Sequence, residues 1–215
     1  GWVQEFRDLV RLNSLIFKYK IQSRVDLLMQ EDTIEALAQS GAETVWVGAE
    51  SGSQKILDAM DKGTTIEEIN KATKLLKKNN IRVAFFLQFG YPGETKADIN
   101  KTLEMVLDLM PDEIGISVSY PLPGTKFFEN VKDQLKTKSN WADSDELALM
   151  FRNTFPPAYY KRLHRYVHKV YRKRVGLKSI LNIIRNPLSV SAKNLRSAIL
   201  ILYYIPASIL DSFLL

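Results

Sequence analysis

The chain has 215 residues, of which 46% are hydrophobic and 25% charged, a composition that excludes a disordered chain and suits one large domain or a domain with an appendage. It contains no cysteine, which excludes disulfide bonds, thiolate catalysis and thiolate-bound metals within these residues. The net charge of +6 is unevenly placed, because residues 1–151 carry 18 basic and 23 acidic side chains whereas residues 152–196 carry 12 basic and no acidic ones.

The absence of cysteine is compatible with a cytoplasmic protein. The first residues include neither an initiating Met nor an apolar signal core, so we expect the chain to be part of a longer protein.

Helical and strand patterns alternate over residues 1–135. In chain order they predict a helix over 2–12, a strand over 19–25, a helix from Asp32 or Thr33 to Gly41, a strand over 44–47, helices over 53–60 and 65–79, a strand over 81–89, a helix over 96–110 and a strand over 113–120. The apolar run 81–89 is typical of a strand buried on both faces of a parallel sheet. Helices between parallel strands require crossover connections, so the expected fold is α/β with a parallel sheet that curls as in barrels.

Four strands do not close a barrel. We therefore expect one edge of the sheet to be incomplete, or covered by something outside this chain.

Three short segments follow predicted strands: 48–53, 90–95 and 121–125. The carboxyl ends of parallel strands open into the ligand crevice, so polar residues and glycines there are candidates for ligand contact. Glu50 suits hydrogen bonds from a vicinal diol, or complements the dipole of the next helix. Lys62, after that helix, is placed to pair with a carboxylate, or to complement the dipole at the carboxyl end of the helix.

The segment Gly90-Tyr91-Pro92-Gly93-Glu94-Thr95 permits close backbone approach to a planar ligand, although plain turn chemistry explains it equally. It lacks the ending of a phosphate-binding loop. Arg24 and Asp26 lie on the same side of the predicted strand. They either form an ion pair or contact a polar ligand.

The tail begins with a linker over residues 151–157. A basic amphipathic helix is expected over 158–174, a second helix over 177–184, and then an apolar run over 197–210 that Pro206 interrupts and that is too short for a membrane span. We rank three roles for the tail: packing on the barrel first, contact with a membrane surface second and nucleic-acid binding third. His164 and His168 lie four residues apart, but without a third ligand they are interpreted as packed or solvated side chains, not a metal site.

Taken together, the segments 24–26, 48–53, 57–65, 90–95 and 121–125 resemble the radical S-adenosylmethionine superfamily. The likeness extends over residues 1–135 and is greatest to the branch of anaerobic magnesium-protoporphyrin IX monomethyl ester oxidative cyclase and cobalamin-dependent iron-sulfur oxidoreductases. It implies the last four strands of a (β/α)6 barrel over residues 1–135, followed by a basic and apolar helical extension over 136–215.

The resemblance implies that S-adenosylmethionine lies across the strand ends. Glu50 matches the position at the ribose, Lys62 a basic position at the methionine carboxylate, and Arg24 a polar strand-end position. The implied cofactor-binding set is Arg24, Glu50, Ser51, Lys62, Gln88, Gly90, Pro92, Gly93 and Glu94, with catalytic residues unassigned and no metal ligand.

The departure from the family is the absence of the three cysteines that ligate its [4Fe–4S] cluster. The resemblance therefore implies a part of an oxidoreductase or cyclase-like enzyme acting on a small molecule, whose cluster ligands, and any cobalamin site, lie in a missing N-terminal part. The chain alone is then expected to be inactive. The alternative is a membrane-surface or nucleic-acid-binding module on a non-catalytic barrel.

Overall fold

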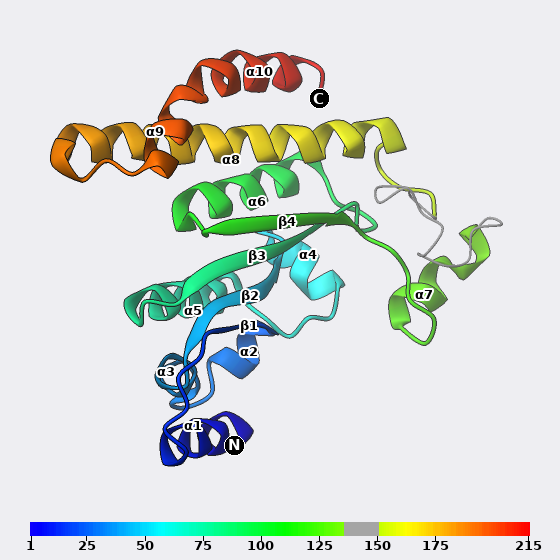
Figure 1. The fold of residues 1–215 in the computed structure, drawn as a ribbon. Helices are drawn as coiled ribbons and strands as arrows, with labels where there is room; N and C mark the ends of the chain where they lie inside the picture. Colours follow the sequence, from blue (N-terminus) through cyan, green and yellow to red (C-terminus); the bar gives the residue numbers. More distant parts are fainter. Residues whose placement is uncertain (136–150) are drawn as a thin grey trace.

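The computed structural model describes residues 1–135 and 151–215 (Figure 1). The elements are α1 (Trp2–Leu12), β1 (Tyr19–Ser23), α2 (Val25–Leu28), α3 (Thr33–Gln39), β2 (Ala42–Glu50), α4 (Gln54–Ala59), α5 (Ile66–Lys78), β3 (Arg82–Phe89), α6 (Lys96–Leu109), β4 (Glu113–Val118), α7 (Lys126–Val131), the 3₁₀ helices η1 (Lys132–Gln134) and η2 (Pro187–Ser189), α8 (Pro157–Arg185), α9 (Ala192–Ile199) and α10 (Ile201–Phe213).

The four strands form a parallel sheet in the order β1-β2-β3-β4, and helices follow each strand. The predicted fold class, an α/β partial parallel barrel followed by a helical extension, is confirmed. Figure 1 shows α6 and α8 beyond β4 at one end of the sheet, and α1 and α3 beside β1 at the other.

The two faces of the sheet differ because successive side chains of a strand point to opposite sides. In β3 the odd-numbered residues Val83, Phe85, Leu87 and Phe89 are almost fully buried under the helices. The even-numbered Phe86 on the other, inner face is only half-buried. Ala84 on this inner face is fully buried, so the prediction that the strand is buried on both faces holds only in part.

Local helix signals explain α5 and α6. Thr65 accepts a hydrogen bond from the backbone N–H of Glu68, whose carboxylate accepts one from the N–H of Thr65, so the predicted capping box is confirmed. Thr95 and Asp98 form the same arrangement at the start of α6.

Three local predictions are wrong. The first strand ends at Ser23, because Arg24 is the N-cap of the short helix α2, which begins at Val25. The second strand runs over nine residues to Glu50, not four. The tail forms one 29-residue helix, α8, where two were expected.

Gly176 lies in the middle of α8, and close packing explains why a glycine is tolerated there. A Cβ at this position would lie 2.5 Å from Cγ1 of Ile201 and 2.6 Å from the carbonyl oxygen of Ser197. The glycine thus allows α9 and α10 to pack directly on α8 (Figure 1).

The tail shares the core of the sheet. Tyr160, Leu163, Val167 and Tyr171 of α8 are buried in the same apolar cluster as the strands. The predicted boundary between residues 135 and 136 stays a prediction, and residues 136–150 of the predicted extension lie outside the described residues.

Candidate functional site

A cavity of about 770 Å³ opens at the carboxyl ends of the strands. Its floor is the inner face of β2, β3 and β4, and its wall is the chain from residue 120 through α7. The lining side chains include Glu50, Lys62, Phe86, Gln88, Tyr91, Ser117, Tyr120, Lys126, Phe127 and Asn130.

Glu50 reaches this cavity through an irregularity at the end of β2. The pairing with β3 shifts between Gly48 and Glu50, which places Ala49 as an extra, fully buried residue. Glu50 has a φ of +55°, a left-handed conformation that non-glycine residues seldom adopt. A Cβ at Gly48 would lie 3.2 Å from Oε1 of Glu50, so the glycine leaves room for this carboxylate beside the inner face.

Lys62 comes from the turn after α4 and faces Glu50. Its Nζ donates to Oε1 of Glu50 at 3.1 Å, with side-chain exposures of 40% for the lysine and 17% for the glutamate. The two residues that the sequence assigned to a diol and to a carboxylate therefore form one ion pair at the cavity mouth. The pair offers an acceptor and a donor within one hydrogen-bond length.

Gln88 lies deeper on the floor of the same cavity. It pairs in register with Ser117 of β4, and Phe86 lies two residues before it on the same face. The ring of Phe86 stacks on Trp46, with centroids 4.6 Å apart. A Cβ at Gly115 would meet Trp46 at 3.1 Å, so the glycine accommodates this aromatic pair.

The cavity wall is held by Tyr91 and Phe127. The Tyr91 hydroxyl donates to the carbonyl oxygen of Ala59 at 2.7 Å, and the ring lies 4.9 Å from that of Phe127. Phe86, Ser117, Tyr91 and Phe127 were not predicted as site residues. Phe86 could have been found from the sequence, because side chains two residues apart in a strand lie on the same face, and Phe86 is two residues before Gln88.

The remaining residues of the 90–95 segment are placed differently. Gly90 has a φ of +79°, its N–H donates to Oε2 of Glu94 at 2.6 Å, and its carbonyl oxygen accepts from the Asn153 side chain. Pro92 and Gly93 are exposed, and none of these four lines the cavity. The segment thus faces the start of α8 as well as solvent.

Glu94 is buried with its Oε1 unpartnered among the described residues. Burial raises the pKa of this carboxyl to about 7. The protonated form is therefore favoured in the folded protein up to near-neutral pH.

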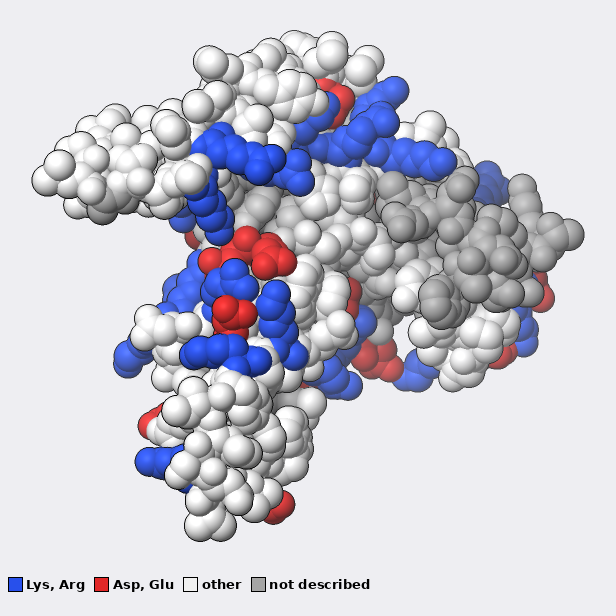
Figure 2. All heavy atoms as spheres, viewed as in Figure 1, with Lys and Arg blue, Asp and Glu red and all other residues white. Residues whose placement is uncertain are grey.

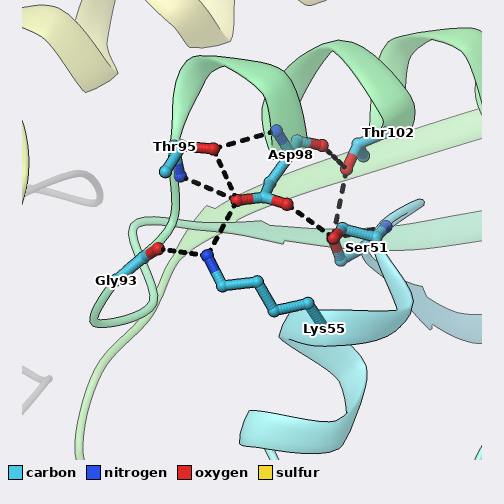
Figure 3. Close-up of polar contacts among 7 residues, drawn as sticks. Ser51, Lys55, Gly93, Thr95, Asp98 and Thr102 are labelled. Atoms are coloured by element: carbon cyan, nitrogen blue, oxygen red, sulfur yellow. Dashed lines mark hydrogen bonds and ion pairs between the residues drawn. The ribbon is translucent and has the colours of Figure 1, made fainter.

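Ser51 belongs to a polar cluster behind the strand ends, not to the cavity (Figure 3). Its hydroxyl lies 3.2 Å from that of Thr102, and the Ser53 hydroxyl donates to Asp98 at 2.7 Å. Lys55 donates to the carbonyl oxygen of Gly93 at 3.0 Å and lies 3.4 Å from Asp98. The cluster fixes the chain after β2 to the start of α6.

Arg24 is not brought into the cavity. It forms a two-bonded ion pair with Asp26, at 2.9 and 3.0 Å, and its side chain is two-thirds exposed. The residues of the predicted set that the structure brings together at the cavity are thus Glu50, Lys62 and Gln88.

No group of three or more metal-ligating side chains occurs within residues 1–135 and 151–215. The rings of His164 and His168 lie 4.7 Å apart in α8. Burial first, and then the neighbouring His164 and Arg172, lower the pKa of His168 to about 4, so this imidazole is neutral at physiological pH.

The fold and the cavity define a class of protein: a parallel α/β partial barrel with a cavity at the strand ends. Residues 3–106 match the family described as Radical SAM superfamily.

Two curated relatives and two solved structures illustrate the likeness. The chain is 29% identical to the anaerobic magnesium-protoporphyrin IX monomethyl ester cyclase of Cereibacter sphaeroides, over 55% of this chain and 20% of that protein. It is 34% identical to tRNA-2-methylthio-N(6)-dimethylallyladenosine synthase of Sulfurihydrogenibium sp., over 45% of this chain and 23% of that protein. The chain thus spans only about a quarter of the length of these relatives.

The solved structures show the fold. The radical S-adenosylmethionine methyltransferase TsrM of Kitasatospora setae, solved with cobalamin and a [4Fe–4S] cluster, has a TM-score of 0.54 at 20% identity, over 61% of this chain and 25% of that one. The cobalamin-dependent S-adenosylmethionine radical enzyme OxsB, with aqua-cobalamin, has a TM-score of 0.52 at 15% identity, over 92% of this chain and 40% of that one. The likeness to OxsB therefore extends into the C-terminal helices.

Proposed function

We propose that the cavity binds S-adenosylmethionine and that the chain supplies this site to a radical S-adenosylmethionine enzyme. The observation that carries the proposal is the convergence of Glu50, Lys62 and Gln88 on one cavity at the strand ends, in a chain that matches this superfamily. In the superfamily, bound S-adenosylmethionine is the source of a 5'-deoxyadenosyl radical once a [4Fe–4S] cluster supplies an electron.

The polar side chains suit parts of this ligand. The Glu50 carboxylate accepts hydrogen bonds from a ribose diol, Lys62 donates to a carboxylate, and the amide of Gln88 does both. Because Lys62 and Glu50 already pair, both side chains are ordered at the cavity mouth before binding, which lowers the cost of ordering them. A ligand that contacts both replaces the bond between them.

The cluster does not fit this chain. A [4Fe–4S] cluster is held by cysteine thiolates, and the sequence has none. We therefore propose that its ligands, and those of any cobalamin, belong to other parts of a longer protein, and that the 215 residues alone bind S-adenosylmethionine without cleaving it.

Isothermal titration of the chain with S-adenosylmethionine tests the binding site. Glu50→Gln is expected to weaken binding about tenfold or more, because it removes the charge that strengthens hydrogen bonds to the diol. The matched control is Glu43→Gln, an exposed carboxylate near the other end of the same strand, which should leave affinity unchanged. Equal affinity of the Glu50 variant and the native chain would remove the carboxylate from the site.

The reaction needs a longer form of the protein that carries the cysteines. There we expect reductive cleavage to 5'-deoxyadenosine, and a small-molecule substrate with an oxidoreductase or cyclase-type product, the class that the sequence motifs resemble. Isolation of a methylated or methylthiolated product would instead place the enzyme with the transferases.

A further inference from the structure

Helix α10 has three polar residues among its four buried ones, and its exposed side chains are mostly apolar. The buried residues are Ile201, Tyr204, Ser208 and Asp211, and Asp211 forms an ion pair with Lys169 at 2.8 Å in which both side chains are largely buried. The outward residues are almost all large and apolar, with Leu202 81% and Phe213 83% exposed. A helix that faces water shows the opposite arrangement.

We name the outward apolar side chains of α10, together with Leu214 directly after it, the α10 surface: Leu202, Ile205, Ile209, Leu210, Phe213 and Leu214. Exposed leucines and isoleucines on α9 and on the last turns of α8 continue it. A contiguous exposed apolar patch of this kind marks an interaction site, since monomeric proteins seldom leave one uncovered.

A basic stripe lies directly beside this surface. Arg162, Arg165, Lys169 and Arg172 follow one another at helical spacing on α8. Three of them contact α10 or the residue after it: Arg162 donates to the carbonyl oxygen of Leu214, Lys169 pairs with Asp211, and Arg172 donates to the Tyr204 hydroxyl at 3.1 Å. Figure 2 shows the result, an uncharged upper edge over α10 and a band of Lys and Arg below it along α8.

The geometry suits lying on a bilayer rather than crossing one. Among the described helices none has the length and apolar content of a membrane span by itself; α9 and α10 reach that criterion only together, and they are bent by 43°. Apolar side chains on the outer face, with cations next to them, are the pattern of an interfacial helix at an anionic surface.

We propose that the α10 surface inserts into the interface of a bilayer that contains anionic lipids, with the basic stripe at the level of the headgroups. Nucleic acid explains the cations but not the outward leucines, because phosphate and base contacts need polar groups. A second copy of the chain explains the leucines but not the stripe, since twelve like charges over residues 152–196 would repel their counterparts.

The test is flotation of the chain with vesicles of phosphatidylcholine, with and without phosphatidylglycerol. We expect binding that requires phosphatidylglycerol and weakens as salt is raised. The triple variant Leu202→Ser, Leu210→Ser and Phe213→Ser should lower the partition coefficient at least about tenfold. The triple variant Arg165→Gln, Lys193→Gln and Arg196→Gln removes one cation of the basic stripe and two of the neighbouring helix α9, all exposed and outside the contacts that hold α10. It should lower the partition coefficient about 100-fold.

Matched controls come from the rest of the molecule. Leu12→Ser with Ile16→Ser removes equally exposed apolar side chains near α1, at the opposite end of the fold (Figure 1). A second control removes three exposed cations from α5 by the substitutions Lys71→Gln, Lys74→Gln and Lys78→Gln. Both controls should bind vesicles as the native chain does, and all variants should keep the native circular dichroism spectrum.

Three results would overturn the proposal. The first is vesicle binding that neither triple variant weakens. The second is binding to an oligonucleotide but not to vesicles, which would assign the stripe to nucleic acid. The third is failure to bind vesicles combined with evidence of a protein contact. That evidence would be a dimer that the apolar variant dissociates, or protection of α10 from hydrogen exchange in a longer form of the protein. Either would assign the α10 surface to a protein contact.

Discussion

Glu94 belongs to the loop after β3, and its carboxyl group lies near the start of α8. Gly90 donates to one oxygen, Asn153 donates to the carbonyl of Gly90, and Tyr160 donates to Asn153 at 3.0 Å. Burial raises the pKa of Glu94 to about 7; the N–H of Gly90 and Lys55 oppose this, and Asp98 reinforces it. One titrating group therefore lies where the C-terminal helix meets the sheet.

Substitution of Glu94 by Gln should change how stability depends on pH. Between the ordinary pKa of 4.5 and about 7, the folded protein keeps a proton that the unfolded chain releases, so native stability falls as pH rises through this window. Glutamine carries no such proton. Urea unfolding from pH 4 to pH 8 should show the free energy of unfolding of the variant rising relative to the native chain by about 3 kcal/mol.

The control for this prediction is Glu43→Gln, which changes an exposed carboxylate of β2. Its free energy of unfolding should follow the native pH dependence. If the Glu94 variant and the native chain gave parallel curves over the whole range, Glu94 would be ionised in the folded protein.

Asp98 is the centre of the polar cluster in Figure 3. Desolvation acts to raise its pKa, but hydrogen bonds from Ser53, Thr95 and Lys55 outweigh it and hold the pKa below its usual value. Asp98→Ala removes these bonds and leaves buried donors unpaired, at a cost of about 3–4 kcal/mol in the free energy of unfolding. Asp98→Asn keeps one acceptor and should cost about half as much.

Asp108, exposed on the same helix α6, provides the comparison. Asp108→Ala should change the free energy of unfolding by less than about 0.5 kcal/mol. Similar losses for the two alanine variants would show that the cluster adds nothing beyond a surface carboxylate.

At the scale of elements, the connection from β2 to α4 depends on close approach to α6. A Cβ on Gly52 would lie 2.6 Å from the carbonyl carbon of Lys101 and 2.7 Å from the Cα of Thr102, both backbone atoms. Gly52→Ala should therefore push the two elements apart and cost about 2–3 kcal/mol in thermal or urea unfolding.

Gly93→Ala is the matched variant, because a Cβ there meets nothing within 4 Å and only the φ of +81° opposes it. We expect a loss of about 1 kcal/mol. A Gly52 variant that lost no more than the Gly93 variant would show that α6 moves aside freely.

Elements whose signals are local could be predicted from the sequence. The capping boxes of α5 and α6 lie within four residues, so their starts at Ile66 and Lys96 follow from the chain itself. The continuity of α8 past Gly176 could not be predicted from the sequence, because it depends on α9 and α10, which pack against that glycine from about twenty residues further along the chain. The end of the first strand at Ser23 was also missed, since the alternation of the sequence continues past that residue.

The same distinction applies to the site. Strand ends and turns identify Glu50 and Lys62, and the structure brings them within 3.1 Å. The cavity wall, in contrast, is built by α7 and Tyr91, whose side chains meet only after the chain folds back over the strand ends. Arg24 lies elsewhere because its partner Asp26 is two residues away on a short helix.

At the scale of the molecule, the sheet and the C-terminal helices share one core. Tyr171 of α8 donates to the carbonyl oxygen of Pro111 at 2.7 Å before β4, and Leu163 and Val167 pack into the cluster that contains the strands. The uncovered inner face and the α10 surface lie on the outside of this core. Ligand binding and membrane contact are thus proposed for faces that the core leaves free.

A shared core predicts one cooperative unfolding transition. Leu57 of α4 and Leu163 of α8 are each 1% exposed, one beneath the sheet and one in the C-terminal helix. Leu57→Ala and Leu163→Ala should each lower the free energy of unfolding by about 2–5 kcal/mol. In calorimetry, both variants should shift the same single transition, with the calorimetric and van't Hoff enthalpies equal. Two transitions, each moved by only one of the variants, would contradict the shared core and would divide the chain into independently folding parts.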